Sequence, residues 1–571
     1  MPSAQKILPG SEAQHLAAAV SQLQAQNAIA RLWKKDPTVF TDDASAYPSI
    51  LNRLGWLDVP GRMLSRTAEI TSFAKEIRKA GFTHAVLLGM GGSSLFAEVL
   101  CQIFGKSADG LELHVLDSTD PSAVLAAAAR LPAPTTLAIV SSKSGTTSEV
   151  SALSKFFWDW FQKADGKPAE HCVAITDAGT PLEKQAKEQS FRRSFVLDKT
   201  LGSDVGGRFS ALTYFGLVPA ALMGIDIDRL LRAGIGMYKK CGPDAPAAEN
   251  PALALGVFLA SLSQAGRDKL TFLCKPPMTA FGIWAEQLIA ESTGKLGNGV
   301  LPVVGEPLWK PSGYGNDRVF VELQWADKPD AAISRHADAL SKAGHPVARI
   351  QWSEAYDLGE EAAKWCVTTA VAGIALRVNP FDEPNVWETK DQTKVILSDY
   401  AKNRSLPQET ATVAEKGVAL YIPSMTSFTT MTDSLRSFVQ GVKDGDFTAI
   451  LSFLPQVPET DALLEKLRKL LGRNGRIPTV VEIGPRYLHS TGQLYKGGPD
   501  RGAFMVLTAD DPVDAPIPGE AFSFSVLKRA QALGDYEALR KKGRRLLRIH
   551  LAKPFEASAK HLANRLEAAL T

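Results

Sequence analysis

Residues 136–161 read TLAIVSSKSGTTSEVSALSKFFWDWF, and this stretch decides the fold. Its first five residues form a short apolar run that ends at a polar cluster, which predicts a buried β-strand. From Glu149 onward, apolar side chains recur at helical spacing, at Val150, Leu153 and Phe157, which predicts an α-helix. A buried strand that enters a helix through a short turn is typical of α/β proteins.

The turn between this strand and this helix, residues 141–148, is dense in hydroxyl groups. Backbone N–H groups at the start of a helix attract anions, and the helix dipole favours negative charge there. Gly145 permits a backbone geometry that wraps several N–H groups around one phosphate. Capping the helix would need only one hydroxyl. We therefore predict a phosphate-binding loop, with an ordinary Ser/Thr-rich capping turn as the alternative.

Strands and helices alternate on both sides of this stretch, which predicts parallel βαβ units in doubly wound sheets. In the first part of the chain we expect strands at residues 84–90, 111–117, 136–140 and 172–177. A second α/β part has expected strands at residues 269–274, 319–323 and 347–352. A third part has expected strands at residues 418–422, 447–454, 478–483 and 503–508.

The chain of 571 residues is too long for one core, and we expect four segments. They are an N-terminal helical segment (1–45), two α/β domains (46–235 and 236–400) and a C-terminal α/β region (401–571). A basic run in the last region, residues 540–548, predicts a solvated helix end.

The composition is that of an ordinary globular protein, with 45% hydrophobic residues, 22% charged residues and a net charge of +3. The small net charge and the lack of a basic stripe with interleaved aromatic residues argue against nucleic-acid binding. The five cysteines lack the spacing of a metal site. We find no run of 18 apolar residues and no secretory signal, so we expect a cytoplasmic protein without a membrane span.

A glycine-rich loop, GMGGSS at residues 89–94, follows an expected strand and opens an expected helix. A dinucleotide-binding unit has this arrangement, and Asp117 would close its next strand. Ser94, however, stands where that motif needs Gly or Ala for close packing, so a NAD-binding dehydrogenase is an alternative of a different class. The simpler interpretation is that residues 89–94 and 141–148 wrap one ligand at the switch point of the sheet.

Arg208 and Glu291 are candidate charged groups of a site. The loop GSDVGGRFS, residues 202–210, presents Arg208, whose guanidinium can approach an oxyanion and keeps its charge. QLIAESTGK, residues 287–295, predicts a helix C-terminus with Glu291 near its end. The dipole there would raise the pKa of a carboxyl, which suits a base that takes a proton from carbon. The alternatives are a turn with an exposed arginine and a surface glutamate.

These motifs, in this order, resemble phosphoglucose isomerases. The resemblance covers residues 80–400 and is carried by GMGGSS, SSKSGTT, SDVGGRFS, ESTGK and NPFDEPNVWETK (379–390). GPRYLHSTGQLYKGGPDRGAF, residues 484–504, is similar to the isomerase half of fused transaldolase–phosphoglucose isomerase proteins. The resemblance implies two sugar-isomerase (SIS) α/β domains with parallel sheets, commonly in a homodimer. It also implies interconversion of glucose 6-phosphate and fructose 6-phosphate through a cis-enediolate, without metal or cofactor.

The resemblance further implies the residues of the site. Glu291 would shuttle the proton between C1 and C2, Arg208 would stabilise the enediolate, and Lys390 would assist at the ring oxygen. The phosphate and the rest of the sugar would be bound by Gly92, Ser93, Ser142, Lys143, Ser144, Thr146, Thr147, Gln287 and Glu383.

Two positions depart from the pattern of that family. Glu383 stands where the family usually has glutamine, which adds a negative charge beside an anionic substrate. Arg318 stands where the best-known members have a ring-opening histidine, and an arginine cannot donate and recover a proton at neutral pH. We therefore predict that His489, in the polar run LHSTGQLYKGG, opens the sugar ring. The alternatives are a hydrogen-bonded loop histidine and Lys390 acting with a water.

Two other functions stay open at this point. One keeps the chemistry but widens the substrate to mannose 6-phosphate. The other is a phosphosugar-binding regulator that uses the same domains without catalysis. The joint presence of Glu291, Arg208 and Lys390 favours an enzyme.

Overall fold

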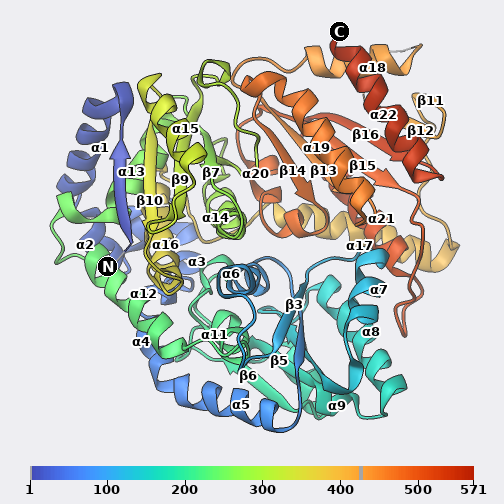
Figure 1. Cartoon of the computed structure of the whole chain (residues 1–571), viewed down its shortest axis with the longest axis horizontal. Coiled ribbons are helices and arrows are strands. Elements are labelled where there is room, and N and C mark those ends of the chain that lie inside the picture. Colours follow the sequence, from blue (N-terminus) through green and yellow to red (C-terminus); the bar gives the residue numbers. More distant parts are fainter. Residues whose placement is uncertain (1–2, 424–428) are drawn as a thin grey trace. The chain divides into compact units, whose positions relative to one another are not determined.

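The computed structural model describes residues 3–423 and 429–571, which divide into two compact units (Figure 1). The first unit contains the residues up to Asp117, Ala128–Gly305 and Arg318–Glu383. The second unit contains Ser118–Ala127, Glu306–Asp317 and Pro384–Thr571. The described residues form helices and three mostly parallel sheets, so the predicted α/β class is confirmed.

The first sheet of the first unit has the strand order β3-β2-β4-β5-β6, and all of its pairs are parallel. Its strands are β2 (His84–Leu88), β3 (Glu112–Leu116), β4 (Thr136–Ser141), β5 (Cys172–Asp177) and β6 (Arg193–Leu197). The chain runs from β2 to β3 on one side and then returns to β4 on the other. The carboxyl ends of β2 and β4 therefore flank the switch point of this sheet, where open α/β sheets commonly bind ligands.

The stretch 136–161 folds as predicted. β4 is buried along its whole length, because both of its faces are covered in a parallel sheet. α8 (Ser148–Ala164) buries Val150, Leu153 and Phe157 on one face. The hydroxyl-rich turn between them lies at the carboxyl end of β4.

The second sheet of the first unit has the order β1-β10-β9-β7-β8. Its strands are β1 (Ala4–Leu8), β7 (Lys269–Leu273), β8 (Leu301–Val303), β9 (Arg318–Trp325) and β10 (Val347–Trp352). β1 pairs antiparallel with β10, whereas the other pairs are parallel. The expected N-terminal helical segment is therefore wrong at residues 4–8, because the open edge of a distant strand, and not local propensity, decides this pairing.

A single apolar core joins both sheets of the first unit. The helices packed in it include α12 (Ile227–Cys241), α13 (Pro251–Gln264), α14 (Met278–Thr293) and α16 (Asp357–Leu376). α16 packs against the other three and is buried on most sides. Gly256 permits the close approach of α13 to α16, since a Cβ at this position would lie 2.6 Å from the side chain of Val371 on α16. This packing sets α14, which carries Glu291, beside the helix that leads into residues 379–383.

The sheet of the second unit has the order β11-β12-β16-β15-β13-β14. Its strands are β11 (Val413–Glu415), β12 (Val418–Tyr421), β13 (Phe447–Phe453), β14 (Thr479–Ile483), β15 (Gly502–Ala509) and β16 (Arg545–Leu551). The interpretation of residues 540–548 as a solvated helix end is wrong in its second half, since β16 is an inner strand. Arg548 is buried, contacts Glu409 and lies 3.6 Å from the ring centre of Tyr421. The density of basic residues predicts a solvated segment, but residues 545–548 pair with strands that are distant in sequence, and the sequence around them does not indicate this pairing.

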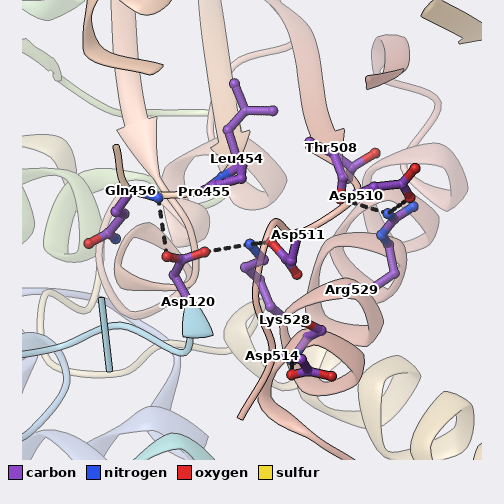
Figure 2. A network of polar contacts seen from close by, with 12 residues as sticks. Asp120, Leu454, Pro455, Gln456, Thr508, Asp510, Asp511, Asp514, Lys528 and Arg529 are labelled. Atoms are coloured by element: carbon purple, nitrogen blue, oxygen red, sulfur yellow. Dashed lines mark hydrogen bonds and ion pairs between the residues drawn. The ribbon is translucent and has the colours of Figure 1, made fainter. Parts of the chain in front are cut away.

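A buried ion network lies at the carboxyl edge of this second-unit sheet (Figure 2). Lys528, on α21 (Phe524–Lys541), is 2% exposed, and its Nζ lies 2.6 Å from Asp120 Oδ2 and also contacts Asp511. The backbone N–H of Gln456 donates to Asp120 Oδ1 at 3.1 Å. Residues 118–127 are thereby joined to the loops that follow β13 and β15.

Candidate active site

Two glycine-rich loops of the first unit touch each other at the carboxyl end of β2. A Cβ on Gly92 would lie 2.1 Å from the carbonyl oxygen of Gly207, so only glycine allows this approach. The hydroxyl of Ser210 donates to the carbonyl of Gly92 at 3.2 Å, which joins the two loops. The contact positions Arg208, the residue after Gly207, close to the switch point of the first sheet.

Arg208 is buried, and acceptors surround its guanidinium. Its Nε donates to Ser292 Oγ at 2.8 Å, so one contact runs to α14. One terminal nitrogen donates to the carbonyl oxygens of Pro380 at 2.7 Å and Asp382 at 2.8 Å. These contacts fix the plane of the guanidinium against residues 379–383. The alternative of a turn with an exposed arginine is therefore wrong.

The other terminal nitrogen of Arg208 is shared by two carboxylates. It lies 3.1 Å from Glu291 Oε1 and 3.1 Å from Glu383 Oε2. A guanidinium that faces two carboxylates keeps its charge, because it cannot be deprotonated in proteins. The arrangement places a carboxylate base and a fixed cation side by side.

Glu291 is buried in the last turn of α14, as the QLIAESTGK pattern predicts, and the alternative of a surface glutamate is wrong. Gln287, one turn earlier, donates from Nε2 to Glu291 Oε2 at 3.1 Å. Burial raises the pKa of Glu291, the guanidinium of Arg208 opposes this, and the carboxylate of Glu383 adds to the increase. A carboxyl with a raised pKa is a stronger base once it is ionised.

Lys295 completes the charged cluster, and it is not among the site residues predicted from the sequence. Its Nζ donates to the carbonyl of Asn379 at 2.5 Å and lies 2.8 Å from Asp382 Oδ1. Burial lowers the pKa of Lys295 to about 8, and the positive charge of Arg208 contributes to this. Lys295 and Arg208 therefore hold residues 379–383 from two directions. The ESTGK motif contains Lys295, but nothing local in the motif indicates these partners.

The predicted phosphate-binding loop presents its hydroxyls at the start of α8. Gly145 has φ +64°, the left-handed conformation that glycine adopts without strain. The Ser142 hydroxyl donates to Thr147 Oγ1 at 3.1 Å, and the exposed Ser144 and Thr146 hydroxyls lie 3.0 Å apart. Within the described residues, the side chain of the N-cap residue, Thr147, makes no capping hydrogen bond. The loop thus gathers hydroxyls that capping does not use.

Contacts of Lys143 and Ser93 connect this loop to neighbouring segments. Lys143 Nζ lies 2.5 Å from Asp177 Oδ2, at the end of β5, and donates to the carbonyl of Ser203 at 3.2 Å. The hydroxyl of Ser141 donates to the carbonyl of Ser93 at 2.8 Å, which links the loop to GMGGSS. The structure thus gives Lys143 protein partners, and its contact with a phosphate stays a prediction.

The phosphoglucose isomerase family model matches residues 58–298, which include the two glycine-rich loops, the hydroxyl-rich loop and Glu291. A glucose-6-phosphate isomerase of Citrifermentans bemidjiense is 33% identical over 243 residues, which are 40% of this chain and 45% of the relative. One of Thermosynechococcus vestitus is 30% identical over 284 residues, 49% of this chain and 51% of the relative. The chain spans about half the length of the curated relatives it matches.

Two solved structures share the fold. A hypothetical protein of Thermus thermophilus has a TM-score of 0.55 at 24% identity, over 69% of this chain and 99% of that one. A glucose-6-phosphate isomerase of Chlamydia trachomatis has a TM-score of 0.53 at 18% identity, over 60% of this chain and 75% of that one. The family match does not favour the dinucleotide-binding alternative for residues 89–94.

Arg318 lies outside the cluster around Arg208. Arg318 is fully buried in β9, and one terminal nitrogen donates to Thr271 Oγ1 at 2.7 Å on the neighbouring strand. Lys390 and His489 belong to the second unit. Lys390 is exposed on α17 (Val386–Asn403), 4.6 Å from the ring centre of Trp387, and His489 is half-buried. The roles of Lys390 and His489 in a phosphoglucose isomerase site stay predictions.

α17, which carries Lys390, is held within the second unit by buried polar contacts. Asn385 and Gln493 exchange two hydrogen bonds, of 2.9 and 2.8 Å. Thr389 donates to the buried carboxylate of Asp535 at 2.7 Å. In residues 3–423 and 429–571 we find no helix that is long and apolar enough to cross a membrane, and no cluster of three or more His, Cys, Asp or Glu arranged to hold a metal.

Proposed function

We propose that this protein is an aldose–ketose isomerase that interconverts glucose 6-phosphate and fructose 6-phosphate through a cis-enediolate. The observation that carries the proposal is the buried ion pair of Glu291 and Arg208. Glu291 Oε1 lies 3.1 Å from a terminal nitrogen of Arg208, in the unit that also contains the hydroxyl-rich loop. Removal of a proton from carbon needs a positioned base and a fixed charge that stabilises the oxyanion. A phosphate anchor away from the chemistry supplies binding energy for orientation.

Each step has a residue in this scheme. Glu291 takes the proton from C2 of the open-chain aldose, and electrons shift to form the enediolate between C1 and C2. Arg208 stabilises the negative charge on the enediolate oxygens. Glu291 then returns the proton to C1, which leaves the ketose, while the hydroxyl proton moves between O2 and O1. Gln287 holds the carboxylate of Glu291 in place throughout.

The remaining parts of the proposal follow the family resemblance. Ser142, Ser144, Thr146 and Thr147 bind the phosphate, with Gly92 and Ser93 beside the sugar. Lys390 assists at the ring oxygen, and His489 opens the ring. The two sugar-isomerase domains span residues 46–235 and 236–400, and the protein is a cytoplasmic homodimer without a cofactor. Mannose 6-phosphate is a second candidate substrate of the same chemistry.

The proposed function is tested with fructose 6-phosphate and a coupled dehydrogenase that detects glucose 6-phosphate. No metal or nicotinamide is added to the isomerase step, which is stopped before the coupling reagents are introduced. The expected result is rapid formation of glucose 6-phosphate. Its absence in the presence of folded protein contradicts the proposal. A parallel assay with mannose 6-phosphate measures the breadth of the substrate.

Ser144→Asp is expected to weaken binding of any 6-phosphosugar by about tenfold or more, because it places a negative charge against the phosphate dianion. Inorganic phosphate should compete with the substrate in the unmodified protein. KM and the inhibition constant of phosphate are measured in both proteins. Ser151→Asp is the matched control: Ser151 is exposed on α8, outside the turn 141–148, and its variant should keep the KM of the unmodified protein. Equal KM in Ser144→Asp and the unmodified protein would move the phosphate anchor to another loop.

His489→Ala is expected to slow turnover of ring-closed fructose 6-phosphate by at least about tenfold, because general acid–base assistance at the ring oxygen is lost. Turnover of an acyclic phosphosugar aldehyde should stay unchanged, since that substrate has no ring to open. Both rates are measured side by side. Unchanged turnover of the cyclic substrate would reject His489 and favour Lys390 acting with a water.

A further inference from the structure

Every nitrogen of the Arg208 guanidinium already has a partner in this structure. An arginine side chain carries five N–H donors and no acceptor. Among the described residues, acceptors lie within 3.1 Å of all three nitrogens of Arg208: one at Nε and two at each terminal nitrogen. Arg208 is also buried, so water does not compete freely for these donors. An enediolate that Arg208 is to stabilise therefore competes with the partners that are already present.

The partners of Arg208 differ in how firmly they are held. Ser292 and Pro380, which supply a hydroxyl and a carbonyl oxygen to Arg208, are both buried. The side chain of Glu291 is 9% exposed and is also held by Gln287. The side chain of Glu383 is 30% exposed, and Arg208 is its one partner among the residues that the structure describes. Glu383 is therefore the partner that can leave at the smallest cost.

Charge balance points to the same residue. The ion pairs of the cluster bring together three carboxylates, those of Glu291, Glu383 and Asp382, and two cations, those of Arg208 and Lys295. The cluster thus has a formal charge of minus one before any substrate oxyanion enters. A further negative charge beside Glu291 and Glu383 is repelled, and charges in a water-poor site repel strongly. If the Glu383 carboxylate moves toward solvent, its repulsion of the incoming anion decreases, and Arg208 can pair with that anion.

We propose that Glu383 is a displaceable partner that occupies the Arg208 donor needed by the substrate oxyanion, and that it thereby sets the affinity of the site for enediolate-like anions. The proposal rests on the proposed isomerase function for the identity of that anion. Glu383 accepts from Arg208 when the site is empty and moves aside when the anion binds. It is a positioning residue that tunes how tightly the site holds the reaction intermediate.

The test uses a five-carbon sugar acid 5-phosphate, whose carboxylate resembles the C1–C2 enediolate in shape and charge. Glu383→Gln keeps the size and one acceptor of the side chain but removes its charge. We expect this variant to bind the sugar acid phosphate about tenfold more tightly than the unmodified protein, as measured by calorimetry, because a like charge is removed. Glu383→Ala, which removes the competing acceptor as well, should gain at least as much.

Asp382→Asn is the matched control. It removes the same charge from the adjacent residue, whose carboxylate pairs with Lys295 and is 40% exposed. A gain in affinity confined to the two Glu383 variants supports a specific competition for Arg208. An equal gain in Asp382→Asn would show that the affinity depends on the net charge of the cluster and would contradict a specific competition for Arg208. Unchanged affinity in both Glu383 variants would overturn the proposal.

The binding measurement separates this inference from the proposed function. It needs no turnover, so the affinities are compared even if the coupled assay shows no isomerase activity. A gain in Glu383→Gln without turnover of fructose 6-phosphate by the unmodified protein would reject the isomerase and keep the competition for Arg208. Normal turnover with no gain in either Glu383 variant would keep the isomerase and reject the role of Glu383.

Discussion

Glu291→Gln is expected to lower kcat by about a hundredfold or more, while the affinity for the phosphosugar stays nearly unchanged. Glutamine keeps the shape of the side chain and an oxygen that can accept from Arg208 or Gln287. It cannot take a proton from carbon, because an amide is not a useful base at neutral pH. Steady-state kinetics with fructose 6-phosphate, together with direct binding of the substrate, separates the loss of turnover from any loss of binding.

Glu98→Gln is the matched control for this variant. Glu98 lies on α6 (Leu95–Phe104) and accepts from Gln102, one turn later, at 2.9 Å, much as Glu291 accepts from Gln287. The control should retain the turnover of the unmodified protein. Turnover of Glu291→Gln near that of Glu98→Gln would mean that another group takes the proton.

The pH dependence of the same reaction follows from the burial of Glu291. Burial raises its pKa above that of an ordinary glutamate, and only the ionised form can act as the base. Activity is therefore present above the raised pKa and is lost as the pH falls through it. The acidic limb of kcat/KM should lie at a higher pH than an exposed glutamate would give, and it should be absent from the residual activity of Glu291→Gln.

Lys528→Met is expected to lower the free energy of unfolding of the second unit by about 3–5 kcal/mol. The variant leaves the carboxylates of Asp120 and Asp511 beside each other without their cation, and Asp120 is 1% exposed. An unpaired buried charge costs far more than the lost attraction, because water cannot solvate it. Adding Asp120→Asn to this variant should restore part of the loss, since it removes one of the two carboxylates.

The loss is measured by native-state hydrogen exchange at the backbone amides of β13 and β15, which report on this unit directly. Lys466→Met is the control in the same unit. Lys466 pairs with Glu567 at 3.1 Å, but both side chains are exposed, and such pairs contribute at most about 1 kcal/mol. Equal exchange rates in Lys528→Met and Lys466→Met would contradict a stabilising role for the buried network.

The sequence is sufficient to predict the parts of this protein that local pattern defines. β4, the hydroxyl-rich turn and α8 follow from one continuous stretch, because strand burial, hydroxyl density and helical spacing all lie within it. The position of Glu291 in the last turn of α14 follows in the same way from the QLIAESTGK pattern. β1 and β16 cannot be predicted in this way, because the strands with which they pair are distant in sequence. In addition, β1 is short and β16 is rich in basic residues.

The contacts that make a site from these parts depend on the tertiary structure. Motif order associates Arg208 with Glu291, but the sharing of Arg208 between Glu291 and Glu383 arises where residues 379–383 fold against α14. Lys528 and Asp120 are 408 positions apart along the chain. A lysine on a helix has the same local pattern whether it faces water or a buried carboxylate, so only the packing of distant segments distinguishes the two.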